Sequence, residues 1–233
     1  MVKHLISRAG EFFVGAGRYA PLATQNEGRT GAPMMAVSKV DMGTPVVGDP
    51  NGYIVSQNLT DAGVFSVSTT VAAALAAGAL AGVADVHRDI VAAWTGTAVL
   101  TVTGTDAYGE TIVQSSASGT SLTGTKAFKT VTNVTTSANI TSLTVGHGDV
   151  LGLPYALEGE FDVLAFYAGT TEEKLASVWV SQVTAVATAT TGDVRGTVNP
   201  DTTLNGSVQL YAWYKVADPA SREGLVGVTQ YGG

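Results

Sequence analysis

Hydrophobic and polar residues alternate with a period of two along much of the chain, and this is the period of a β-strand. The clearest case is TAVLTVTG, where Ala98, Leu100 and Val102 lie on one face and the residues between them, mostly threonines, on the other. The segment GTDAYG then turns the chain, and residues 110–114 run back. This pattern predicts an antiparallel hairpin.

Similar short segments recur along the chain and are separated by turn residues. They predict strands at 53–59, 63–69, 127–134, 140–145, 150–156, 161–167, 176–189, 193–198, 208–216 and 224–231. The tetrapeptide GHGD at 146–149 predicts a tight turn between two of them. The spacing favours an all-β fold, an antiparallel β-sandwich or jelly-roll-like body.

The segment VQLYAWYKV follows the turn signal Asn205-Gly206 and alternates strictly over residues 208–216. One of its two faces carries Tyr211 and Trp213, which are large side chains for a solvated surface. We therefore expect another sheet or another subunit to cover this face.

Two neighbouring segments do not follow the strand pattern. Residues 71–84 are continuously apolar and Ala-rich, but they are too few to cross a bilayer, so they predict a short buried helix. Residues 85–94 fit helical spacing, although Trp94 could equally open a strand, so both interpretations stay open.

The chain divides by composition into three parts. Residues 1–52 hold four of the seven prolines and show no sustained period, which predicts an extended N-terminal arm; the alternative is a loop folded back on its own domain. The first thirty residues carry a formal charge of +2 in a chain of net charge −7, so the remainder carries −9. Residues 53–165 are expected to form the sandwich body, and residues 166–233 either complete it or form a small second β domain.

Composition narrows the possible functions. The acidic charge, with a pI near 4.8, argues against nucleic acid as a partner. The absence of cysteine excludes thiolate nucleophiles, disulfides and cysteine-based zinc sites. The first twenty residues interrupt their apolar positions with charges and lack the pattern of a secretory signal, so we expect synthesis in the cytoplasm and no membrane partner.

We find no strong candidate for a catalytic, cofactor or metal site. His147 with Asp149 is interpreted as part of a turn, and the carboxylate pairs Glu158/Glu160 and Glu172/Glu173 as solvated side chains. The sequence therefore predicts a protein that is not an enzyme and needs no cofactor.

Three motifs occur in order within residues 95–217: GTDAYGE, GTKAFKTV and GHGDVLGLP, followed by GDVRGTVNPDTTLNGSVQLYAWY. In this order they resemble structural proteins of tailed bacteriophage virions, most closely head decoration (cement) proteins. The resemblance implies a virion protein on the capsid exterior that binds the major capsid protein, bridges adjacent capsomers and forms a homo-oligomer, often a trimer.

The arm lies outside this resemblance, and its role is predicted from its residues alone. Interfaces are enriched in aromatic residues and arginine. We therefore expect Phe12, Phe13 and Tyr19 to be apolar anchors on the capsid, and Arg8 and Arg18 to meet its acidic groups.

Two other functions remain open. The chain could be a head-fibre or tail β-module that binds host-surface glycans through Trp179, Tyr211 and Trp213. It could also be a β-sandwich glycosidase that uses Glu158 and Glu160, which would require a carboxylate pair facing each other across a cleft.

Overall fold

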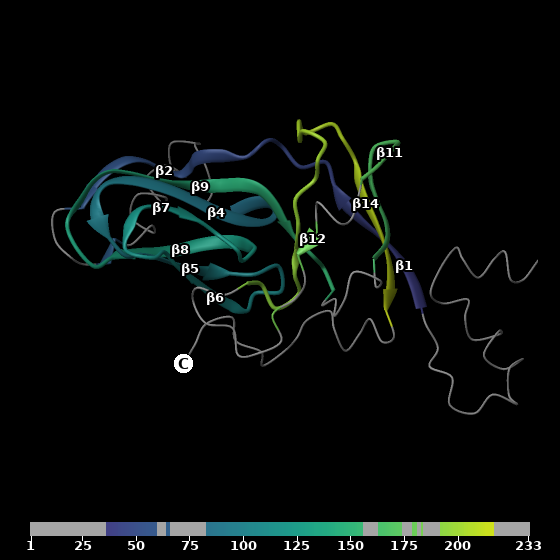
Figure 1. Ribbon diagram of the computed structural model, residues 1–233, viewed down its shortest axis with the longest axis horizontal. Coiled ribbons are helices and arrows are strands. Elements are labelled where there is room, and N and C mark those ends of the chain that lie inside the picture. Colours follow the sequence, from purple (N-terminus) through teal and green to yellow (C-terminus); the bar gives the residue numbers. More distant parts are fainter. Residues whose placement is uncertain are drawn as a thin grey trace, which may run out of the picture.

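The computed structural model describes residues 36–59, 64–65, 83–155, 163–173, 179–180, 183 and 192–216. Every regular element in this part of the chain is a β-strand, and all strand pairs are antiparallel (Figure 1). No helix long and apolar enough to span a membrane occurs among these residues. The predicted all-β, antiparallel architecture is confirmed.

Most strands belong to one ten-stranded sheet. Its main path runs β12-β13-β9-β4-β8-β5-β6, while β2 pairs with β9, β3 with β8 and β7 with β4. The strand bounds are β2 Asp49–Leu59, β3 Val64–Phe65, β4 Val83–Ala98, β5 Leu100–Thr105, β6 Thr111–Ser115, β7 Gly119–Thr123, β8 Phe128–Thr136, β9 Ile140–Gly152, β12 Trp179–Val180 and β13 Thr197–Val198. The sheet curls, so that β2, β9, β4 and β7 lie over β8, β5 and β6 as in a sandwich (Figure 1).

The interior of this curled sheet is the larger hydrophobic core. It is built from the inward-facing residues of seven strands and includes Tyr53, Ile54, Ile90, Trp94, Leu100, Val102, Ile112, Phe128, Val134, Ile140, Leu143 and Val145. Along β5 buried and half-buried residues alternate at every step, as the period-two pattern predicts. Hydroxyl groups pair across the strands on the other face, Thr101 with Ser115 at 2.8 Å and Thr105 with Thr130 at 2.6 Å. Threonine thus gives this face a neutral, hydrogen-bonded surface.

A second, four-stranded sheet has the order β1-β14-β10-β11 and stands across the end of the larger one (Figure 1). Its strands are β1 Ala36–Gly43, β10 Val163–Ala168, β11 Thr171–Glu172 and β14 Leu210–Val216. Its inner face packs against the end of β9 in a second core. This core comprises Met42, Leu151, Leu153, Phe166, Ala168, Val198, Leu204, Leu210 and Ala212.

The hairpin predicted between residues 98 and 114 is confirmed as β5 and β6. Its loop is held by Asp106, whose carboxylate accepts the N–H groups of Tyr108 at 2.8 Å and Glu110 at 3.0 Å. The predicted turn before β14 is also present. Gly206 has a φ of 74°, and the side-chain oxygen of Asn205 accepts the N–H of Ser207 at 2.9 Å.

The prediction of a tight turn at residues 146–149 is wrong, because β9 runs without a break from Ile140 to Gly152. The glycines serve close packing and do not turn the chain. A Cβ on Gly146 would overlap the carbonyl oxygen of Asp49 on β2, and one on Gly152 would overlap the imidazole of His87 on β4. Glycine at these positions lets neighbouring strands approach.

The ambiguous segment 85–94 is strand, since it lies within β4. The predicted Ala-rich helix at 71–84 lies outside the described residues up to position 82, and its last two residues open β4. The predicted strand at 63–69 is described only at β3, that at 176–189 only at β12 and residue 183, and that at 224–231 not at all.

The expected boundaries between the three parts do not coincide with the ends of strands. The boundary after residue 52 falls inside β2, and the boundary after residue 165 falls inside β10. Residues 36–43, assigned to the arm, form β1 and pair along β14 from Ala36↔Val216 to Gly43↔Leu210. This pairing joins strands that are far apart in the sequence. Local composition does not encode such long-range hydrogen bonding, so it could not place β1 in the sheet. Residues 1–35 of the predicted arm lie outside the described residues.

Candidate functional site

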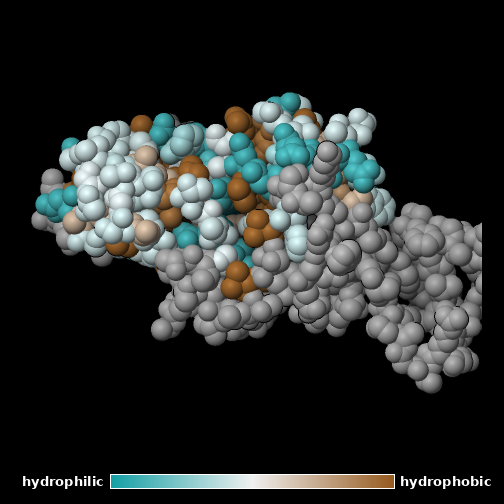
Figure 2. Space-filling model, in the orientation of Figure 1, coloured by the Kyte–Doolittle hydropathy of each residue, from teal (hydrophilic) through white to brown (hydrophobic). Residues whose placement is uncertain are grey.

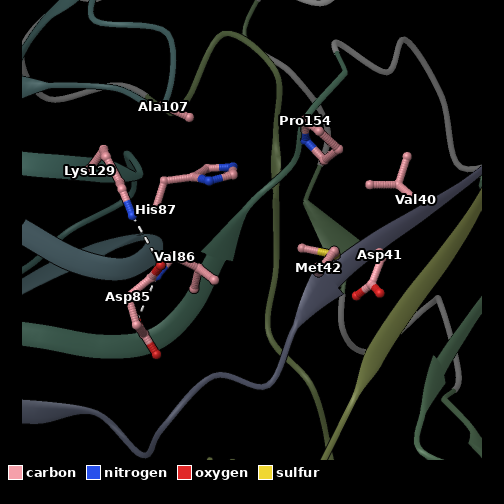
Figure 3. A pocket seen from close by; sticks show the side chains of 9 residues that line it. All are labelled: Val40, Asp41, Met42, Asp85, Val86, His87, Ala107, Lys129 and Pro154. Atoms are coloured by element: carbon pink, nitrogen blue, oxygen red, sulfur yellow. Dashed lines mark hydrogen bonds between the residues drawn. The ribbon is translucent and has the colours of Figure 1, made fainter.

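A pocket of about 280 Å³ lies where the two sheets meet (Figure 3). It is lined by Val40, Asp41 and Met42 of β1, Asp85, Val86 and His87 of β4, Ala107 of the β5–β6 loop, Lys129 of β8 and Pro154 after β9. The wall is mainly apolar, and the imidazole of His87 reaches into it from β4 (Figure 3).

His87 supplies the imidazole of this wall, which also contains the exposed carboxylate of Asp41. Its Nε2 is buried and has no hydrogen-bond partner. Burial lowers the pKa of His87; nearby Asp193 opposes this shift, and the positive charge of Arg195 adds to it. The imidazole is therefore neutral at pH 7, and its edge packs against Gly152 of β9.

The ammonium group of Lys129 is bound to the framework. It donates to the carbonyl oxygens of Ala84 at 2.7 Å and Asp85 at 3.0 Å, and Figure 3 shows the side chain reaching from β8 to β4. Both acceptors belong to the first residues of β4. Lys129 thus ties β8 to β4.

Arg88 is the centre of a buried polar junction next to the pocket. Its guanidinium is fully buried and binds the Asp85 carboxylate through Nε and Nη2, both at 2.7 Å. It also donates to the carbonyl oxygens of Val46 at 2.6 Å and Gly148 at 3.2 Å. One arginine therefore connects β4, β9 and the loop between β1 and β2.

The carboxylate of Asp85 completes this junction. Burial raises its pKa, but the hydrogen bond from Arg88 and the N–H groups of Val46 and Val86 outweigh burial and hold the pKa below its ordinary value. Asp85 is therefore ionised at neutral pH and remains paired with Arg88. Its charge therefore serves to hold Arg88 in place.

Three further titratable groups lie behind Arg88, on β2, β4 and β9. Burial raises the pKa of Asp89 to about 6, although the N–H of Val150 donates to its carboxylate at 3.2 Å. Burial also raises the pKa of Tyr53 and, together with the charge of Arg88, lowers the pKa of His147. The rings of Tyr53 and His147 lie 5.8 Å apart. At pH 7 this cluster contains a neutral imidazole and a carboxylate that burial destabilises.

A second ion pair joins the β5–β6 loop to the loop before β13. Arg195 binds Asp106, both side chains are buried, and the guanidinium lies 4.9 Å from the centre of the Tyr108 ring. The hydroxyl of Tyr108 donates to the carbonyl of Pro154 at 2.7 Å. This pair therefore fixes one rim of the pocket.

Asp193 and Lys126 lie in the same region and differ in their contacts. The carboxylate of Asp193 accepts the N–H groups of Ala127 at 3.0 Å and Arg195 at 2.9 Å. The amine of Lys126 is buried without a hydrogen-bond partner, and burial lowers its pKa to about 8. Asp193 stabilises the loop, while Lys126 carries a proton that burial makes easy to lose.

Two carboxylates at or next to the pocket are held in ion pairs. The carboxylates of Asp85 and Asp106 are each held by an arginine, and the described residues contain no group of three or more histidine, cysteine or acidic side chains placed to hold a metal ion.

The five residues predicted to contact the capsid, Arg8, Phe12, Phe13, Arg18 and Tyr19, lie outside the described residues. The pair Glu158 and Glu160 lies outside them as well.

The remaining candidates from the sequence, His147, Asp149 and Glu173, lie within or next to strands, and two of them accept backbone hydrogen bonds. His147 and Asp149 lie on a continuous strand, and Asp149 accepts the N–H of Gly48 at 2.7 Å. Glu173, expected to be solvated, is buried and accepts the N–H groups of Asp201 at 2.8 Å and Thr202 at 3.0 Å. It therefore anchors the loop before β14.

The three aromatic residues proposed to bind glycans, Trp179, Tyr211 and Trp213, do not lie together on one surface. Trp179 is half-buried and packs against the second core. Tyr211 and Trp213 lie on the outer face of the four-stranded sheet, where the ammonium of Lys39 lies 3.8 Å from the centre of the Tyr211 ring and 5.7 Å from that of Trp213. A lysine of the neighbouring strand β1 thus lies over these rings, and the expected cover by another sheet or subunit stays a prediction.

Sequence reasoning missed the junction around Arg88 and the pair of Arg195 with Asp106. A signal for the first was present. Asp85 and Arg88 are charges within a segment that is otherwise compatible with a buried strand, and a charge in such a place needs a partner. No comparable signal exists for the second pair, whose members are far apart in the sequence.

Comparison of the chain with protein-family models, with curated proteins and with solved structures finds no match.

Proposed function

We propose that this chain is a structural protein of a tailed-phage virion that binds the outer surface of the capsid and stabilises it by bridging capsomers. The support from sequence is the ordered set of motifs within residues 95–217. The support from geometry is an antiparallel β framework in which buried charge is used to fix loops.

One observation carries the proposal on the structural side. The two fully buried arginines, Arg88 and Arg195, each bind a carboxylate from their own framework, and Arg88 also binds two backbone carbonyl groups. Breaking such a pair costs several kcal/mol because it leaves a buried charge unpaired. These contacts fix the loops that they join, and fixed loops suit a protein that holds neighbouring capsomers in place.

Stabilisation of the shell follows from mass action. A protein that binds the assembled shell but not its dissociated subunits adds RT ln(1 + [L]/Kd), which is about 2.7 kcal/mol per site at a hundredfold excess over Kd. Many such sites on one particle make the effect large. In this proposal the major capsid protein is the partner, the chain acts as a homo-oligomer, and no catalysis or cofactor is involved.

The contact with the shell is proposed to include the N-terminal segment. Deletion of residues 1–30 removes the proposed anchors Phe12, Phe13 and Tyr19, while the described strands begin at residue 36. We expect the truncated chain to fold and to lose binding to capsid shells prepared without this protein. Co-sedimentation with the shells measures binding, and circular dichroism checks the β body.

The controls separate two ways in which the proposal could fail: the N-terminal arm is not the contact, or the chain does not bind the capsid at all. The variant F12S/F13S keeps the full length and should bind as weakly as the deletion. Shell binding by both variants at the full-length level would remove the arm from the proposal. Failure of the full-length chain to bind any shell, or its absence from the outer surface in virion images, would refute the decoration function.

One observation favours the second candidate, a head-fibre or tail module that binds glycans. In the register of the four-stranded sheet, Tyr211 lies opposite Tyr167 on β10 and next to Trp213 on the same face, so three aromatic rings share one side of the sheet. Aromatic faces of this kind can stack on sugars. Glycan-array binding that is lost in W213A, without loss of fold, would support this alternative.

A further inference from the structure

The loop between β1 and β2 presents two apolar side chains to solvent. Val46 is 46% exposed and Val47 is 54% exposed, and the pair follows Pro45 in the chain. Figure 2 shows apolar surface, drawn in brown, within the zone between the two sheets, where this loop crosses from one to the other. Together the two valines form a small apolar surface in a chain rich in threonine.

The backbone of this loop is held at four points. The N–H of Val46 donates to Asp85 at 2.9 Å, and its carbonyl accepts from Arg88 at 2.6 Å. The N–H of Gly48 donates to Asp149 at 2.7 Å, and the carbonyl of Pro45 accepts the N–H of Gly206 at 2.9 Å. Local turn chemistry supplies none of these contacts, which span 39 to 161 positions of sequence.

Burying the charge of Arg88 carries a large desolvation free energy, yet the loop that it fixes points its valine side chains outward. Removing charges from water costs several kcal/mol. Fixing the exposed tip of the loop, which consists of Val46 and Val47, does not stabilise the hydrophobic core. Rigidity does help binding, because a loop that is already ordered loses little entropy when it docks. The geometry therefore favours a recognition role for the tip.

The charges around the tip define the chemistry of the partner. Asp49 and Asp149 are exposed next to Gly48: Asp49 follows it in the chain, and the Asp149 carboxylate accepts its N–H. Asp149 also lies 3.8 Å from the guanidinium of Arg88, but this one buried cation faces both Asp85 and Asp149, so the acidic charge is in excess. The tip is thus an apolar knob with an acidic rim. A second copy of this chain, with a net charge of −7, would meet like charge there.

We infer that Val46 and Val47 insert into an apolar socket with a lysine or arginine rim on the outer face of the capsid shell. This inference rests on the proposed decoration function and adds a second contact, on the β body, to that of the N-terminal segment. The knob fixes how the body sits on the shell, whereas Asp49 and Asp149 steer it electrostatically.

The test measures binding of purified full-length protein to capsid shells prepared without it. The variant V46T/V47T keeps side-chain size but places two hydroxyl groups in the socket, and we expect binding about 100-fold weaker. The single variants V46T and V47T should each lose about tenfold. Because both side chains are half exposed, the variants should unfold at the wild-type temperature.

The matched control is V55T, which changes a valine of β2 that is 64% exposed and lies away from the loop. We expect it to bind within about twofold of wild type, as a surface change away from the interface should. The variant D49N keeps the acceptor for the Asn51 N–H, which lies 2.9 Å away, and removes one charge. It should bind more slowly at low salt and show a weaker salt dependence.

Each outcome decides the inference. Loss of binding in V46T/V47T with V55T unchanged supports it. Equal binding by wild type, V46T/V47T and V55T overturns the knob while the decoration function stands. A wild-type chain that does not bind the shells overturns both, so the two failures are distinguishable.

Discussion

Replacement of Arg88 by methionine tests the central claim that buried charge holds this framework together. The side chain makes four hydrogen bonds, two to Asp85 and one each to the carbonyls of Val46 and Gly148. Methionine fills the volume but satisfies none of these acceptors. Breaking a buried pair costs 3 to 5 kcal/mol, and because the Asp85 side chain remains 32% exposed we expect about 3 kcal/mol.

Urea denaturation at pH 7 measures this loss as a shift of the midpoint at constant slope. For a chain of this size about 3 kcal/mol corresponds to roughly 6 to 12 °C in Tm. The double variant R88M/D85N removes the stranded charge and should recover part of the loss. Hydrogen exchange adds a local readout, because the amides of Val46 and Gly48 should lose protection first.

Two results would contradict this role of Arg88. A loss below about 1 kcal/mol in R88M would mean that the pair contributes no more than a surface ion pair. Unchanged exchange at Val46 would mean that Arg88 does not hold the loop between β1 and β2.

Two further predictions concern β4 and β9. Burial raises the pKa of Asp89 from 3.8 to about 6, so the folded state binds its proton more tightly than the unfolded state. The stabilisation is fully present below pH 3.8 and is lost as the pH rises to about 6, by at most about 3 kcal/mol. Unfolding at pH 4 and pH 8 should show that D89N lacks this loss; equal pH dependence in both proteins would contradict the assignment. In G146A the new Cβ would overlap the carbonyl oxygen of Asp49, so we expect the free energy of unfolding to fall by about 3 kcal/mol in urea denaturation. The control G119A adds its Cβ in open space and should lower the free energy of unfolding by less than about 0.5 kcal/mol. Equal losses in the two variants would show that β2 does not approach β9 so closely.

The candidate site was the part of the molecule least visible in the sequence. The proposed capsid anchors of the N-terminal segment stay predictions, since they lie outside the described residues. The pocket next to His87 is built from β1, β4, β8 and two loops, and no segment of the sequence carries more than three of its residues in succession. Only the packing of the two sheets brings these residues together.

The sequence alone determined the all-β class, the hairpin of β5 and β6 and the alternation along β14. These features depend on the side chains at i and i+2, which the sequence displays directly. It misjudged Gly146 and Gly148 because glycine permits a turn and also a close strand crossing, and local sequence does not distinguish the two.

Only the tertiary structure decided which strands are neighbours. Strand β1 pairs with β14 although they are more than 160 residues apart, and Arg88 binds Gly148 across 60 positions. The backbone groups that join strands are the same in every residue, so the choice of partner depends on how complete faces fit together. That fit is a property of the folded chain as a whole, and it placed the buried ion pairs and the loop carrying Val46 and Val47.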